Sequence, residues 1–261
     1  MVNERVAVAL EDVAVGYRRG GDLTTVVRGI DATLECGRLV ALLGRNGAGK
    51  STLLRTLAAF QQPLAGKVCY GCNEQGHLSQ QELAKKVAVV LTGGGFAALT
   101  VRELVSLGRT PYTNFMGRLT RTDKEIVEEA MLQMGVMHLA QRPVENLSDG
   151  ERQKCLIAKA IAQQTPLMLL DEPTAFLDFQ SKVALFRTMR SLAGEAGKAV
   201  LVSTHDVEMA LRFADELWII ADGKLHVGTP ALLAGNGVLQ SFIDGDGIKY
   251  DKTTGRVDII L

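Results

Sequence analysis

The chain of 261 residues is poor in aromatic side chains, and neither sign of charge is in excess. Aromatic residues make up 5%, which is few for the stacking platforms that bind single-stranded nucleic acid. Lysine plus arginine and aspartate plus glutamate both number 29, so no basic excess indicates a nucleic-acid partner. We therefore expect a protein that does not act on nucleic acid.

Long hydrophobic runs and an apolar leader are also missing. No run approaches the roughly 18 apolar residues that a membrane-spanning helix needs. The first residues, Met1 to Arg5, lack the apolar region of a signal peptide. We expect that the chain itself does not cross a bilayer, although it could lie against a protein that does.

Cysteine is scarce and scattered, at Cys36, Cys69, Cys72 and Cys155, as in a cytosolic protein with reduced thiols. Cys69 and Cys72 form a C-x-x-C pair with His77 nearby, but no second pair follows. Two interpretations stay open for this pair: a zinc or redox site, or two small residues in a strand and its turn.

The chain does contain a glycine-rich loop of the form G-x-x-x-x-G-K-S. Its eight residues are Gly44, Arg45, Asn46, Gly47, Ala48, Gly49, Lys50 and Ser51. The loop follows the apolar run 39–43 and precedes a run with helical spacing from Thr52. Glycines let backbone N–H groups face phosphates, Lys50 adds a positive charge, and the Ser51 hydroxyl can bind Mg²⁺. The alternative is a turn with a chance lysine, but the context favours a phosphate site.

A second motif is a run of four apolar residues, 167–170, that ends in Asp171 and Glu172. A buried strand can deliver Asp171 to Mg²⁺, whereas Glu172 points elsewhere and can polarise an attacking water. Strands often end in acids by chance. Together with the phosphate loop, however, this pair indicates hydrolysis of a nucleoside triphosphate.

A third motif lies between these two. Ser148 precedes a helical run, and Glu151 stands at the capping-box position. The segment is either a well-capped helix or a helix N-terminus that is offered to a phosphate. Its place between the phosphate loop and the acidic pair favours the second interpretation.

The remaining pattern predicts an α/β protein. Apolar runs predict strands near 6–15, 25–30, 39–43, 68–70, 86–91, 167–170, 199–202, 217–220 and 224–227. Residues 99–163 read mainly as helix, with a capping box at Thr100. Residues 236–261 read as a short extension, and the alternation after Gly255 suggests an edge strand.

In this order the motifs resemble those of the ATPase subunits of ABC transporters, over nearly the whole chain. Residues 44–51 are similar to the Walker A motif, 167–172 to Walker B, 147–151 to the LSGGQ signature, 175–178 to the D-loop and 203–206 to the H-loop. The resemblance implies a RecA-like P-loop NTPase core with an N-terminal antiparallel β subdomain and a helical insertion at about 95–163. It further implies an ATPase domain over 1–235 and an extension over 236–261.

The resemblance also implies ATP and Mg²⁺ as cofactors, and two copies that face each other head to tail. Adenine would stack on Tyr17, and the triphosphate would lie on residues 44–51 and Thr52. Ser51, Asp171 and Thr92 would hold Mg²⁺. Glu172 and His205 would be catalytic. Ser148 and Gly150 would cap the ATP of the other copy.

Two positions depart from the family's pattern. Thr92, followed by three glycines, stands where the Q-loop glutamine is usual. A threonine hydroxyl has less reach toward Mg²⁺ or water than a glutamine amide. Asp149 replaces the usual glycine of the signature, and a carboxylate near a triphosphate is unfavourable unless it points away. Both departures concern how tightly ATP hydrolysis is coupled to transport, and not whether ATP binds.

Residues 107–113, Leu-Gly-Arg-Thr-Pro-Tyr-Thr, resemble a stretch in the ATPases of importers for iron–siderophore complexes, haem and cobalamin. The alternative is an ordinary turn between helices. The resemblance implies a peripheral protein at the cytoplasmic face of the cell membrane, bound to integral-membrane permease subunits, with a periplasmic binding protein as an indirect partner. Phe96, Phe115 and Met116 are candidate apolar contacts with the permease.

Two other functions remain open. One is a soluble ABC ATPase that acts on DNA or ribosomes, although such proteins usually carry two cassettes or a long coiled-coil insertion. The other is a nucleotide-binding regulatory module that turns over poorly, which Thr92 and Asp149 would favour.

Overall fold

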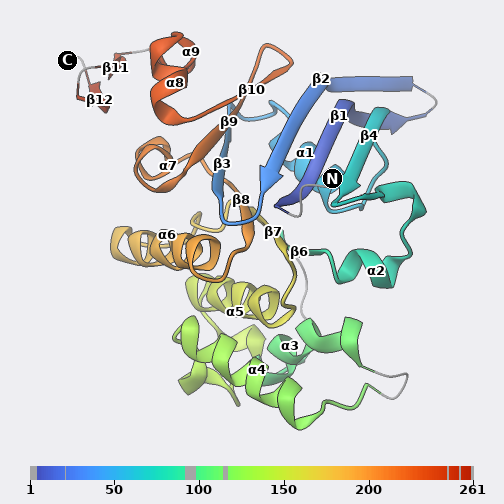
Figure 1. Cartoon of the computed structure of the whole chain (residues 1–261). Coiled ribbons are helices and arrows are strands. Elements are labelled where there is room, and N and C mark those ends of the chain that lie inside the picture. Colours follow the sequence, from blue (N-terminus) through green and yellow to red (C-terminus); the bar gives the residue numbers. More distant parts are fainter. Residues whose placement is uncertain are drawn as a thin grey trace.

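The computed structural model describes residues 5–20, 22–91, 98–113, 117–245, 247–252 and 254–259. A six-stranded sheet lies at the centre, a four-stranded sheet at one side and a group of helices below (Figure 1). Among the residues described, no helix has the length and apolar character that crossing a membrane requires. Thr92, Phe96, Phe115 and Met116 fall outside these ranges.

The central sheet has the strand order β10-β9-β3-β8-β7-β6. The strands are β3 Leu39–Gly44, β6 Val87–Val90, β7 Leu167–Asp171, β8 Ala199–Ser203, β9 Glu216–Ala221 and β10 Lys224–Gly228. All neighbours are parallel except β9 and β10, which form a hairpin. Strands β3, β7 and β8 are buried at every residue. Because they are adjacent and parallel, their carboxyl ends meet at one edge of the sheet.

The second sheet is antiparallel, in the order β2-β1-β4-β5, as predicted for the N-terminal subdomain. Its strands are β1 Val6–Arg19, β2 Asp22–Glu35, β4 Ala65–Tyr70 and β5 Asn73–Glu74. Its inner face shares one hydrophobic cluster with β3 and with the first helix, α1. This shared cluster brings β1 and β2 beside the glycine-rich loop.

The helices begin where the sequence offers capping residues. They are α1 Lys50–Leu57, α2 Gln80–Ala84, α3 Val101–Ser106, α4 Arg121–Gln133, α5 Asp149–Ala162, α6 Phe179–Gly194, α7 Val207–Phe213, α8 Pro230–Gly235 and α9 Val238–Ile243, with 3₁₀ turns η1 Gln75–His77, η2 Leu107–Tyr112, η3 Met137–Leu139 and η4 Val144–Asn146. Thr100, Thr120 and Ser148 each close a capping box at the start of α3, α4 and α5. These three helices pack on one another as the predicted helical segment.

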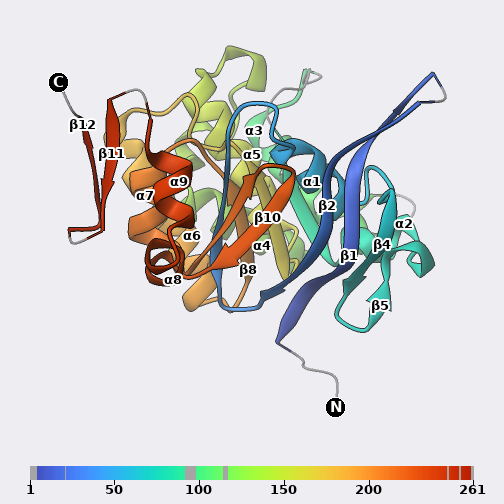
Figure 2. The ribbon, with the colours of Figure 1, turned by 90° about the horizontal axis from the view of Figure 1, so that it is seen from above.

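The C-terminal strand β12, Arg256–Ile259, pairs with β11, Ile248–Asp251, in a separate two-stranded sheet. The strand predicted after Gly255 is therefore present, and in a two-stranded sheet it is an edge strand. Tyr250 anchors the hairpin because its side chain is 5% exposed within the main hydrophobic cluster. Figure 2, a view from above, shows the hairpin at the edge of the molecule beside α9. The domain boundary at residue 235 stays a prediction.

Candidate functional site

The glycine-rich loop has the backbone conformation that its glycines allow. Gly49 is the N-cap of α1 with φ +111°, and Gly47 has φ +78°. A Cβ on Gly49 would lie 2.7 Å from a methyl carbon of Val26 in β2, so no larger residue fits there without displacement. The loop thus places the first turn of α1 with its N–H groups open toward the carboxyl edge of the sheet.

Lys50 is buried under this loop. Its Nζ donates to the carbonyl oxygen of Gly44 at 2.8 Å and to that of Arg45 at 3.5 Å. Burial lowers the pKa of the ammonium group, whereas the carboxylates of Glu172 and Asp171 oppose that shift. The fold therefore brings the lysine and the acidic pair, far apart in the sequence, within electrostatic reach of one another.

The acidic pair is held by Ser203, the first residue of the segment 203–206, for which the sequence predicted no role of its own. The Ser203 hydroxyl donates to Asp171 Oδ1 at 2.6 Å and accepts from the Glu172 backbone N–H at 2.9 Å. Ser203 stands directly opposite Asp171 in the pairing of β7 with β8. Glu172 has φ +45°, an uncommon conformation for a non-glycine residue and one that clusters at functional sites. Ser203 belongs to the segment similar to the H-loop, but its contact with the acidic pair depends on the register of two parallel strands.

Glu172 and His205 meet at the end of β8. His205 Nε2 lies 2.5 Å from Glu172 Oε1, and the two side chains are 47% and 33% exposed. A carboxylate open to solvent can accept a proton from water, and an adjacent imidazole can orient that water. The structure therefore brings both candidate catalytic residues together, and their roles stay predictions.

The predicted metal ligands have suitable chemistry for Mg²⁺, which binds one or two protein oxygens besides phosphates and waters. Ser51 is exposed in the first turn of α1, and the Asp171 carboxylate ends the neighbouring buried strand β7. Thr52 is half-buried, and Arg45, Asn46 and Gly47 are exposed with Ala48 partly so. The roles of these residues stay predictions, and Thr92 lies outside the described part of the chain.

Tyr17 lies in β1 and is 52% exposed. It pairs with Thr24 of β2, two residues before Val26, which touches the position of Gly49. The ring is therefore on the strand pair that flanks the glycine-rich loop and is open to solvent. Its stacking on adenine stays a prediction.

The signature segment, residues 147–151, has its own local organisation. Ser148 accepts from the Glu151 backbone N–H at 3.3 Å and donates to Glu151 Oε2 at 2.9 Å. The Asp149 carboxylate accepts from Arg152 Nη1 at 2.8 Å, in a solvent-exposed ion pair. A guanidinium therefore lies within one helical turn of this negative charge, and the effect of Asp149 on coupling stays a prediction.

Gly150 packs on the D-loop of the same chain, residues 175–178. A Cβ on Gly150 would lie 3.1 Å from Leu177 Cδ2. None of the hydrogen bonds or ion pairs found among the described residues joins Ser148 or Gly150 to the glycine-rich loop. Within the described part of one copy, none of these bonds therefore links the two predicted halves of the ATP site.

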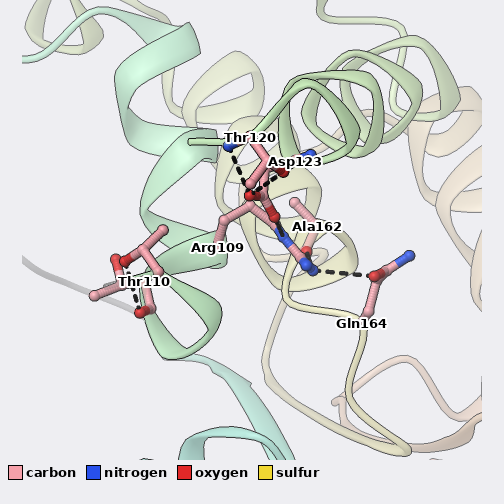
Figure 3. A network of polar contacts seen from close by, with 7 residues as sticks. Arg109, Thr110, Thr120, Asp123, Ala162 and Gln164 are labelled. Atoms are coloured by element: carbon pink, nitrogen blue, oxygen red, sulfur yellow. Dashed lines mark hydrogen bonds and ion pairs between the residues drawn. The ribbon is translucent and has the colours of Figure 1, made fainter. Parts of the chain in front are cut away.

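Residues 107–112 are more than an ordinary turn, because Arg109 is a buried clasp (Figure 3). Its guanidinium donates to Asp123 Oδ1 at 2.9 Å, to the Ala162 carbonyl at 2.9 Å and to Gln164 Oε1 at 3.0 Å. A hydrogen bond from the Thr120 hydroxyl is the main cause that keeps the pKa of Asp123 below its usual range, and Arg109 adds to it. The clasp joins η2, the start of α4 and the end of α5.

Comparisons with known proteins show the family to which the chain is similar. Residues 27–175 match the ABC transporter family. The chain is 40% identical to the hemin import ATP-binding protein HmuV of Bordetella pertussis, over 93% of this chain and 95% of that protein. It is 34% identical to the iron(3+)-hydroxamate import ATP-binding protein FhuC of Bacillus subtilis, over 87% of this chain and 86% of that protein.

A solved structure also has this fold. It is a dimeric ATP-binding cassette in a post-hydrolysis state, bound to ADP and phosphate. It aligns with a TM-score of 0.76 and 26% identity, over 85% of this chain and 98% of that chain. With the family match, the relatives and the site geometry together, the chain belongs to the ABC transporter family as an ATP-binding and ATP-hydrolysing subunit.

Proposed function

We propose that this ATPase powers the import of a metal chelate of the iron–siderophore, haem or cobalamin class. The relatives named above import haemin and iron hydroxamate. The proposal depends mainly on the surface around residues 107–112, a segment that resembles a stretch in such importers. We propose this surface as the docking platform for a membrane subunit.

The platform has an aromatic centre and an adjacent groove. The Tyr112 ring is 39% exposed and covers the Arg109 guanidinium, 4.2 Å from the ring centroid, while Lys85 Nζ lies 5.6 Å from it. A cavity of about 440 Å³ adjoins α2, and its lining includes Phe60, which is 63% exposed, and Lys159. An amphipathic helix of a membrane protein would fit such a groove.

We further propose that the permease binds at this platform on the cytoplasmic face of the membrane, with a periplasmic binding protein delivering cargo to it. A rigid platform transmits motion better than a mobile loop. The Arg109 clasp supplies that rigidity, since one buried side chain ties η2 to both α4 and α5. Helix α5 begins at the signature segment, so docking and ATP capping share one element.

The hydrolytic step follows from the chain's own residues. Ser51 and Asp171 would hold Mg²⁺, which neutralises charge on the phosphates when bound. Lys50 would leave the carbonyl oxygens of its own loop and contact phosphate. Glu172 would accept a proton from the attacking water, and His205 would orient that water. Ser148 and Gly150 of a second copy would close over the γ-phosphate.

Uptake of radiolabelled iron–siderophore, haemin or cobalamin tests the proposal. Cells that lack the gene are complemented with the parent chain, with Glu172→Gln or with the matched control Glu125→Gln, whose side chain is exposed on α4. We expect the parent and the control to restore uptake of one chelate, and Glu172→Gln to fail. Normal uptake of every chelate in cells without the gene would contradict the cargo class.

Detergent extracts test the docking platform. An affinity-tagged parent chain should retain a multi-span membrane protein, and the double variant Phe60→Ser, Tyr112→Ala should lose it. The control Leu132→Ser changes another exposed apolar side chain, 63% exposed on α4, away from the platform. Equal retention by all three chains would contradict docking at Tyr112.

A further inference from the structure

The C-terminal hairpin, β11 with β12, forms one wall of a cavity whose other walls carry the hydrolytic residues. The cavity measures about 520 Å³, and its lining includes Glu172, His205, Ala175 and Val207 on one side and Ile248 and Val257 on the other. Tyr250 fixes the hairpin to the body, whereas Ile248 remains 42% exposed. The hairpin thus presents apolar side chains beside the catalytic pair, at the end of the molecule where α7 and α9 lie (Figure 2).

Two large apolar side chains lie exposed next to this cavity. Phe176 and Phe179 are 62% and 68% exposed, at the D-loop and at the start of α6. The D-loop is not loose, since Leu177 packs on Gly150 and Asp178 caps α6 by accepting from the Ser181 N–H at 2.7 Å. Phe176 is not among the cavity's lining residues, although its neighbour Ala175 is. Phe176 and Phe179 are three residues apart, and two large exposed aromatic side chains in one short segment make this surface a candidate for an interaction.

We propose that Phe176 of each copy inserts into the cavity of the other copy, against Ile248 and Val257 of its hairpin. This inference rests on the proposed function, because it needs the two-copy assembly in which Ser148 of one copy reaches the ATP of the other. The same surface of each copy carries both partners of this contact: the aromatic plug, which is Phe176, and the apolar socket, which is Ile248 with Val257. A two-fold symmetric dimer requires such self-complementarity, because each copy then contributes both halves.

The contact would also affect ATP hydrolysis, because it lies beside the hydrolytic residues. A buried aromatic ring would exclude bulk water from the space beside Glu172 and His205 while the dimer is closed. Aromatic side chains in desolvated sockets provide much of the free energy at protein interfaces. The contact between Phe176 and the hairpin would form only when the dimer closes, and it would stabilise the closed state.

Measurement of ATP-dependent dimerisation tests this contact. The background is the full chain with Glu172→Gln, which is expected to bind ATP without hydrolysing it. In this background we introduce Phe176→Ser, Ile248→Ser and the two substitutions together. Sedimentation velocity with Mg²⁺ and ATP gives the dissociation constant of the dimer. We expect each single variant to raise it about tenfold or more, as for a central interface residue. The double variant should add little to either single variant, because both remove the same contact.

Two controls make the test specific. Lys249→Ser changes the opposite face of the hairpin, and Leu23→Ser changes an exposed apolar side chain on β2, 54% exposed. Both should dimerise like the background. Thermal unfolding without ATP should show no coupling between positions 176 and 248, because the contact forms only between copies.

The outcomes separate this inference from the proposed function. If the Glu172→Gln background stays monomeric with ATP, the two-copy mechanism itself fails. If the background dimerises and Phe176→Ser or Ile248→Ser dimerises equally well, the plug-and-socket contact alone is wrong. Fully additive effects of the two substitutions, or the same coupling in the monomer, would also overturn it.

Discussion

Lys50 illustrates how a single residue is prepared for a ligand. The buried ammonium group is satisfied by the carbonyl oxygens of its own loop, at 2.8 Å from Gly44. Burial disfavours the charged form, and the nearby carboxylates of Glu172 and Asp171 favour it. A phosphate would exchange these bonds to neutral carbonyl oxygens for hydrogen bonds between two charged groups.

We predict that Lys50→Ala weakens ATP binding by about 1.5–3 kcal/mol, or roughly tenfold to a hundredfold, because a hydrogen bond between charged groups is lost. Equilibrium titration with a fluorescent ATP analogue measures the dissociation constant. Lys67→Ala removes a lysine whose side chain is 59% exposed and serves as the control. Equal affinities for both variants would show that Lys50 does not contact phosphate.

At the scale of elements, the segment at residues 107–112 shows why a motif and its structural reason differ. Gly108 is required by close packing, because a Cβ there would lie 2.3 Å from the Lys159 carbonyl oxygen in α5. Arg109 is required by burial, because three acceptors from two other segments of the chain converge on it. The sequence identified this segment through its resemblance, whereas the contacts with α5 could not be inferred from residues so distant along the chain.

We expect Gly108→Ala to lower the free energy of unfolding by about 1–3 kcal/mol, since the added methyl group must displace backbone. Urea denaturation measures the change. Gly76→Ala is a matched control, because nothing lies within 4 Å of a Cβ at that position. Equal stability of the two variants would mean that η2 can move away from α5 without cost.

Arg109→Lys should lower the free energy of unfolding by about 1–3 kcal/mol, because an ammonium group cannot serve three acceptors with the geometry of a guanidinium. Arg121→Lys is the control, since that side chain is 94% exposed in its pair with Glu125. For an exposed pair we expect a change of no more than about 0.5 kcal/mol. Similar urea midpoints for the two variants would argue against the clasp.

At the scale of the whole molecule, one copy holds only part of the predicted ATP site. Lys50, Asp171, Glu172 and His205 converge at one edge of the sheet, while Ser148 belongs to the helical segment and caps α5. A structural neighbour with the same fold, bound to ADP and phosphate, is a dimer. A site shared between two copies predicts complementation between two inactive variants.

We predict that Lys50→Ala and Gly150→Asp are each inactive alone and active when mixed. The second variant adds a carboxylate where the γ-phosphate of the other copy would approach. In a mixed dimer, one site keeps an intact glycine-rich loop and an intact signature, so steady-state ATP hydrolysis should return. Circular dichroism confirms that both variants fold. A mixture as inactive as its components would contradict a site shared between copies.

Local sequence determined those features of this protein that depend on neighbouring residues. The glycines at 47 and 49 allow a left-handed backbone at φ +78° and +111°, and Thr100, Thr120 and Ser148 close capping boxes at three helix starts. The apolar runs at 39–43, 167–170 and 199–202 became buried parallel strands. Steric freedom, capping and hydrophobic periodicity act over a few neighbouring residues, so these features can be predicted from one sequence.

Tertiary structure alone decided which distant residues meet. Strand register placed Ser203 opposite Asp171, helix packing buried Arg109 between α4 and α5, and a separate hairpin brought Ile248 beside His205. Each of these contacts joins two segments that are distant in the sequence. The helix caps and the apolar spacing of either segment do not depend on the contact. They form because burying the apolar faces of the sheet and the helices together leaves one compatible arrangement, and that arrangement sets the neighbours of every polar side chain.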